Sequence, residues 1–145
     1  MAEGLLTHAL RADPDLSRRF RVGSAGLAAA DGEPASANAL EAMRRAGIDL
    51  HSHRSRPLTP ELAAEASVLL GMTRDHLRMI ETLFPDQPRQ LQLFRSHAGG
   101  GDPEVPDPFG GNLQEYLETR DALVEAIPGL LQYLRSGSLD RPETV

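Results

Sequence analysis

Apolar residues recur at helical spacing in several stretches of the chain, separated by connections rich in proline, glycine and polar residues. In residues 1–11, leucines and alanines three and four positions apart predict an amphipathic helix. Asn112 and Glu115 form a capping pair for a long final helix, which Pro128 is expected to interrupt or kink. The final helix is expected to end near Gly137, and further helices are predicted from Pro34 to Gly47, after Thr59-Pro60, and from Thr73 to about Leu83.

Three shorter stretches carry patterns typical of strands. Residues 66–72 form an apolar run bounded by turn signals and predict a fully buried parallel strand, whereas residues 90–94 alternate and predict an edge strand. Residues 19–27 predict a short buried strand that runs into a tight turn. Alternating strands and helices predict the α/β class, an open doubly wound parallel sheet with helices on both faces. One domain is expected over residues 1–137, followed by a solvated tail at 138–145.

Composition narrows the classes of function. The 145 residues carry a net charge of −6, which argues against general nucleic-acid binding. No apolar run is long enough to span a membrane, so we expect a cytoplasmic protein. Cysteine is absent, which excludes disulfides, thiolate metal sites and a cysteine nucleophile within these residues. His51 and His53 have a period-two spacing but no third ligand nearby, so neither a metal nor a cofactor is expected.

The most constrained loop of the chain holds a single carboxylate. Pro106 and Pro108 restrict the backbone on both sides of Asp107, and Phe109 follows at once. An acid held in this way can donate a proton to a leaving group. Taken alone, Asp107 is better explained as the cap of a turn, and Phe109 as an ordinary packing residue of the loop.

Several motifs together resemble one known family. They occur in order and with fitting spacing over residues 1–135: Met1-Ala2-Glu3-Gly4-Leu5-Leu6, Ser24-Ala25-Gly26, Gly32-Glu33-Pro34-Ala35, Ala46-Gly47-Ile48-Asp49-Leu50, His53-Arg54-Ser55-Arg56-Pro57-Leu58-Thr59, Gly71-Met72-Thr73 and Asp107-Pro108-Phe109-Gly110-Gly111. The chain resembles the low-molecular-weight protein-tyrosine phosphatases, most closely the bacterial type. The resemblance implies the phosphotyrosine phosphatase I-like fold, with a sheet of about four strands.

The resemblance also implies a chemistry and its residues. In the family, a first central strand leads into a loop whose cysteine attacks phosphorus and whose arginine binds the phosphoryl oxygens. Asp107 matches the general acid and Phe109 an aromatic wall beside the substrate ring. Ser24 and His53 match side chains that hold the phosphate loop in shape. Residues 31–35 match the pocket mouth.

The matching residues also have plainer interpretations. A serine before Ala25-Gly26 often only caps a turn, so Ser24 need not be functional. Arg54 and Arg56 could bind phosphate, yet a solvated basic connection explains them equally well.

The family's first strand and cysteine loop have no counterpart in this sequence, and three interpretations remain open. The first is that the chain is an incomplete form of a phosphocysteine-type phosphatase that acts on phosphotyrosine or phosphoarginine in proteins. A pseudophosphatase that binds without catalysis is the second, and an arsenate reductase-like protein, which also needs cysteines, is the third. As written, the chain is expected to be inactive. Without a central strand it is also expected to fold poorly or to self-associate through exposed strand edges.

Overall fold

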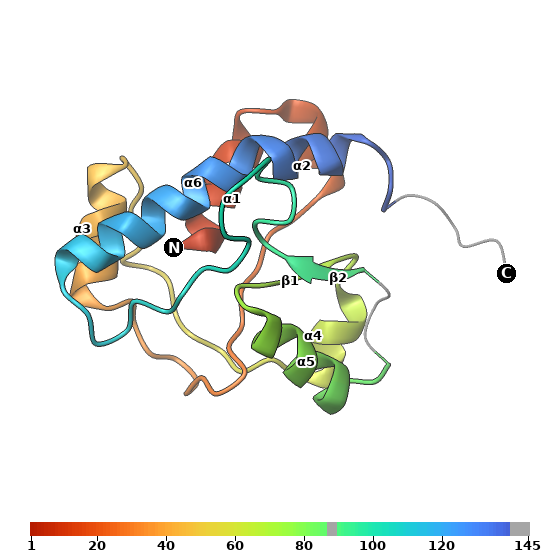
Figure 1. Ribbon diagram of the computed structural model, residues 1–145, viewed down its shortest axis with the longest axis horizontal. Helices are drawn as coiled ribbons and strands as arrows, with labels where there is room; N and C mark the ends of the chain where they lie inside the picture. The colour runs from red at the N-terminus through yellow and green to blue at the C-terminus, as the bar shows by residue number, and fades with distance from the viewer. Residues whose placement is uncertain (87–89, 140–145) are drawn as a thin grey trace, which may run out of the picture.

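A computed structural model describes residues 1–86 and 90–139 of the chain (Figure 1). These residues form six helices and two short strands, and four of the helices come before the first strand. They are α1 (Ala2–Arg11), α2 (Pro14–Arg19), α3 (Ala37–Arg45), α4 (Pro60–Glu65), β1 (Leu69–Gly71), α5 (Arg74–Leu83), β2 (Leu91–Leu93) and α6 (Leu113–Arg135).

Local capping explains where most helices begin. The Thr73 hydroxyl accepts a hydrogen bond from the amide of His76 at the start of α5. At the start of α6, Asn112 and Glu115 each accept from the other's backbone amide, so the predicted capping pair is confirmed. The expected start at Pro34 is wrong, because Ser36 caps α3 and the helix begins at Ala37.

Two other helical features differ from the sequence-based expectation. Helix α2 was not predicted; the Asp13 side chain accepts from the amides of Asp15 and Leu16 and so initiates a further helix at Pro14. Pro128 does not interrupt α6, which runs unbroken to Arg135. A proline that lacks an amide hydrogen is tolerated where the carbonyl one turn earlier can meet water, and Val124 at that place is exposed.

The sheet consists of two parallel strands among the described residues. Leu69, Leu70 and Gly71 of β1 pair with the three residues of β2 in register. Both predicted strands are therefore confirmed in shorter form, although β1 is half-buried rather than fully buried. Helices α4 and α5 lie on one side of the sheet and α1, α2 and α6 on the other, while α3 packs against α6 away from the strands (Figure 1). The predicted α/β class is confirmed.

The predicted buried strand at residues 19–27 is wrong. Arg19 ends α2, and the chain that follows is extended and mostly exposed. Its only bridge among the described residues joins Gly26 to Pro57. A strand needs a neighbour to satisfy its amides and carbonyls, and β1 offers its second edge to no described strand. The described sheet thus has fewer strands than the roughly four expected.

The core lies where α6 packs against α1 and α3. Leu16, Met43 and Leu130 are its largest fully buried side chains. Leu139 packs partly buried against the same cluster, while residues 140–145 of the expected tail lie outside the described part of the chain. The single domain over residues 1–137 stays a prediction.

Candidate active site

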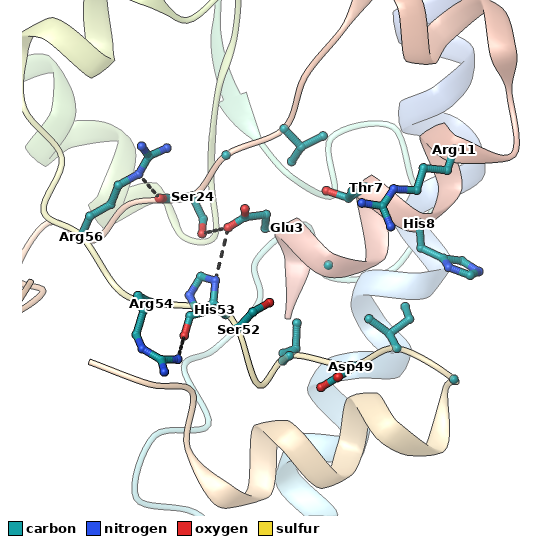
Figure 2. Close-up of a pocket in the computed structure, with 16 residues that line it drawn as sticks. Glu3, Thr7, His8, Arg11, Ser24, Asp49, Ser52, His53, Arg54 and Arg56 are labelled. Carbon is teal, nitrogen blue, oxygen red and sulfur yellow. Dashed lines mark hydrogen bonds and ion pairs between the residues drawn. The ribbon is translucent and has the colours of Figure 1, made fainter. Parts of the chain in front are cut away.

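A cavity of about 620 Å³ lies along α1, from Glu3 to Arg11 (Figure 2). One wall is α1 itself, a second is the extended segment 22–24, and the third is the connection 47–56. The cavity therefore gathers three segments that are far apart in the sequence. It also contains two of the predicted site residues, Ser24 and His53.

Glu3 joins these two residues in the cavity. Its carboxylate Oε2 accepts a hydrogen bond from the Ser24 hydroxyl, and the same oxygen lies 3.5 Å from His53 Nδ1 (Figure 2). The side chains of Glu3 and His53 are each about a third exposed, at 32% and 30%. Sequence reasoning did not assign a role to Glu3. Its only signal was its place in the first turn of an amphipathic helix, which many glutamates share.

The order of contacts in this cluster limits its chemistry. The carboxylate of Glu3 lies between the hydroxyl and the imidazole, so Glu3 is the hydrogen-bond partner of Ser24. Activation of a serine nucleophile requires the imidazole next to the hydroxyl, with the carboxylate behind it. The cluster is therefore suited to holding neighbouring backbone in place and not to nucleophilic attack.

Two arginines border the cavity and are fixed by backbone carbonyls. Arg56 donates from Nε to the Ser24 carbonyl over 2.9 Å. One amino group of Arg54 donates to the carbonyls of His51 and His53 at 2.8 and 2.7 Å. Both side chains are exposed. These bonds hold the connection 47–56 in shape and leave positive charge at the cavity rim.

The neighbouring histidine faces another carboxylate. His51 Nδ1 lies 2.6 Å from Asp49 Oδ1, and the His51 amide donates to the same oxygen. The amide first, and the ring second, hold the pKa of Asp49 below its usual value. His51 and His53 thus point to different acids, and the described residues contain no group of three metal-ligating side chains.

The Asp107 loop is held by a backbone contact where it begins and by a side-chain contact of Asp107 itself. The Val105 amide donates to the carbonyl of Met72, directly after β1, over 2.8 Å. Asp107 Oδ1 accepts from the Phe109 amide at 3.0 Å, which closes a short turn. Phe109 is 84% exposed. The contact to Met72 places the loop at the carboxyl end of the sheet, where ligands bind in open α/β folds.

The predicted site residues therefore fall into two groups. Ser24 and His53 share the cavity, whereas Asp107 and Phe109 are not among the described residues that line it. Residues 31–35 pair with the connection beside the cavity through the bridge between Pro34 and Arg54. The described part of the chain brings the support residues together and leaves the acid loop separate.

The comparisons with known proteins identify the family. The sequence profile of the family described as low molecular weight phosphotyrosine protein phosphatase matches residues 1–139. The chain belongs to this family. A protein-arginine-phosphatase from Bacillus subtilis (strain 168) is 35% identical over 79% of this chain and 75% of its own length. The low molecular weight protein-tyrosine-phosphatase Etp of Escherichia coli (strain K12) is 29% identical over 77% of this chain and 69% of its own.

Solved structures of phosphatases share the fold of this chain. The YwlE arginine phosphatase from Geobacillus stearothermophilus has a TM-score of 0.82 and 31% identity, covering 99% of this chain and 89% of its own. A YwlE mutant with a phosphorylated active-site serine in place of cysteine has a TM-score of 0.85 and 31% identity, covering 94% and 88%. The open α/β architecture of this family member is thereby confirmed. No helix in the described ranges has the length and apolar character that crossing a membrane demands.

Proposed function

We propose that this chain is the scaffold and acid-bearing part of a protein phosphatase that works through a phosphocysteine. Asp107 is the general acid, and Phe109 packs beside the substrate side chain. Ser24 and His53, joined through Glu3, support the phosphate-binding loop. The nucleophilic cysteine must come from outside these 145 residues, because they contain none.

The proposed reaction has two steps. A cysteine thiolate attacks phosphorus, the bond from phosphorus to the leaving atom breaks, and Asp107 gives that atom a proton. In the second step, Asp107 takes a proton from a water molecule as the water attacks the phosphocysteine. Inorganic phosphate and the thiolate are released. One oxygen of Asp107 accepts from the Phe109 amide, and the other is left for proton transfer.

The observation that carries this proposal is the contact of Ser24 and His53 with Glu3 in one cavity. These side chains are 29 positions apart in the sequence and converge on the first turn of α1. A helix N-terminus presents unpaired amides and a positive dipole end, and no side chain in the described ranges caps α1. Ser24 and His53 therefore lie beside a helix N-terminus that is suited to binding a phosphoryl group.

The substrate is a phosphorylated side chain of a protein. Relatives of this chain carry the names protein-arginine-phosphatase and protein-tyrosine-phosphatase. Both phosphoarginine and phosphotyrosine are therefore candidate substrates, and peptides of each kind belong in the assay.

A pseudophosphatase is the second candidate function, since cysteine is missing from the 145 residues. Such a protein would keep the cavity and bind a phosphorylated partner without turnover. The two candidates differ in whether a supplied nucleophile restores catalysis.

A fusion protein separates the two candidates. The strand and cysteine loop of an active family member are joined ahead of Met1, and hydrolysis of an aryl phosphate, a phosphotyrosine peptide and a phosphoarginine peptide is measured. We expect turnover from the fusion and none from the 145-residue chain. Asp107→Asn in the fusion should lower kcat about 10²- to 10⁴-fold, as loss of a general acid does.

Two controls accompany this experiment. A serine in place of the grafted cysteine should abolish turnover, and Asp75→Asn, which changes an exposed carboxylate on α5, should leave it unaltered. A folded fusion that binds phosphate but hydrolyses none of the substrates would contradict the enzyme and favour the pseudophosphatase. Equal activity of the fusion with and without Asp107→Asn would contradict the role of Asp107.

A further inference from the structure

Arg95 is a buried cation outside the candidate site. It follows β2 and is 7% exposed. Its Nε donates to the carbonyl of Asp102 at 2.9 Å, and a second nitrogen lies 3.4 Å from the carbonyl of Gly100. Its other amino group donates to the Ala122 carbonyl and to Glu125 Oε2 on α6. One guanidinium therefore joins the loop that follows β2 to the middle of α6.

This loop leads directly to Asp107. The side chain of Asp102 accepts from the amide of Glu104 at 2.9 Å. The next amide, that of Val105, donates to Met72 at the end of β1. Asp107 comes two residues later, after a proline that leaves the backbone little freedom. In Figure 1 the trace after β2 rises against α6 before it turns towards the start of that helix.

The composition of the loop shows why it needs such a contact. Gly99 and Gly101 have positive φ angles of 80° and 78°, and Gly100 lies between them. Three consecutive glycines lose more conformational entropy on ordering than other residues do. The planar, five-donor guanidinium of Arg95 can hold several carbonyls at once, which the single ammonium of a lysine does less well.

We propose that Arg95 is a positioning residue that fixes the loop carrying Asp107 by binding it to α6. The proposal deepens the proposed function, on which the role of Asp107 as an acid rests. Arg95 itself does not contact the substrate. It acts through the carbonyls of Gly100 and Asp102, which set where Val105 meets β1 and so where Asp107 lies.

Hydrogen exchange tests the structural part on the 145-residue chain. In Arg95→Gln, the amides of Glu104 and Val105 should exchange about tenfold faster or more, while those of α1 stay unchanged. Arg120→Gln is the matched control. Arg120 is also mostly buried and donates to a backbone carbonyl, that of Ala42, but it does not touch the loop. It should leave the loop amides unaltered.

A second variant covers the case in which Arg95→Gln fails to fold. Gly101→Ala disturbs the same contact from the loop. The positive φ of Gly101 disfavours any side chain there, and the new Cβ would lie 3.2 Å from the Arg95 guanidinium. It should accelerate exchange at Glu104 and Val105 in the same way. Unchanged loop amides in the folded variants, or equal acceleration throughout the molecule, would overturn the proposal.

Kinetics of the fusion protein described above test the link to the acid. Arg95→Gln should lower kcat about tenfold for phenyl phosphate, with little change in KM. The loss should be smaller for nitrophenyl phosphate, whose leaving group needs less protonation, and Arg95→Lys should restore part of the rate. An equal loss for both substrates, or a rise in KM alone, would show that Arg95 does not position the acid. A fusion that is inactive before any change bears on the proposed function alone, because the exchange experiment needs no turnover.

Discussion

Asp13 serves two elements with one carboxylate. Oδ1 accepts from the amides of Asp15 and Leu16 and caps α2, while Oδ2 accepts from the guanidinium of Arg135 near the end of α6 at 2.9 Å. The Leu16 amide first, and Arg135 second, hold the pKa of Asp13 below its usual value. Folding therefore favours the charged form of this side chain.

Stability should depend on pH through Asp13. Because its folded-state pKa is lower than its unfolded one, the contribution is complete above about pH 5 and is lost as the pH falls through the folded-state value. Asp13→Asn keeps a capping side chain but removes the charge. We expect its free energy of unfolding to fall below that of the native chain near neutral pH and to converge with it in strong acid.

Urea unfolding between about pH 2 and pH 7 measures this difference. Arg135→Met supplies the control, since Asp13→Asn should have a smaller effect where its partner is already absent. A difference that does not change with pH would contradict the role of the charge.

The sequence indicated some residues of the candidate site and missed another. Resemblance to the family indicated Ser24 and His53, and the cavity brings both together, although their roles remain predictions. Glu3 was missed because its importance arises from two partners that are distant in sequence. The expected turn cap at Asp107 is present, and its catalytic role stays a prediction.

At the scale of elements, two glycines lie inside helices and differ in what surrounds them. A Cβ on Gly4 of α1 would meet the tips of flexible side chains, first Leu50 at 2.9 Å and then Met43 at 3.2 Å. A Cβ on Gly129 of α6 would instead run into the backbone carbonyl of His97. Helix propensity alone favours alanine at both places by up to about 1 kcal/mol.

Gly129→Ala should therefore destabilise the protein by roughly 1 to 3 kcal/mol, as overpacking does, although propensity favours it. Gly4→Ala is the matched control, and we expect it to be close to neutral because the side-chain tips of Leu50 and Met43 can move. Chemical denaturation of both variants gives the comparison. Equal effects of the two changes would show that the approach of His97 to α6 is not rigid.

Helices, whose capping residues lie close to them in the sequence, were predicted better than strands, which depend on pairing with a distant strand. The caps at Thr73 and Asn112 lie within three residues of the amides they satisfy, so their helices could be placed from sequence. A strand cannot satisfy its backbone amides and carbonyls by hydrogen bonds within itself and needs a neighbouring strand. Residues 19–27 carry a strand-like pattern but no described neighbour to pair with, and the prediction failed there.

At the scale of the whole molecule, the sheet has an open side. The second edge of β1 and the extended residues 20–25 form no ladder with any described strand. Exposed edges of this kind template pairing with other chains. A strand placed between them would satisfy both.

The 145-residue chain should consequently self-associate, and the fusion that carries an added strand should not. Sedimentation velocity over a range of concentrations measures this, with the average mass of the chain alone rising with concentration and that of the fusion staying constant. Thermal unfolding gives a second readout, because the fusion should melt more cooperatively. A chain that remains monomeric and unfolds in one sharp transition would refute this prediction.

The sequence by itself determined the α/β class, most helix starts and the family, because periodicity, caps and ordered motifs are properties of neighbouring residues. Only the tertiary structure decided that Glu3 joins Ser24 to His53, that Arg95 binds the loop before Asp107, and that Gly129 must remain small. Each of these depends on contacts between segments far apart in the chain, which only folding brings together and which no local pattern encodes.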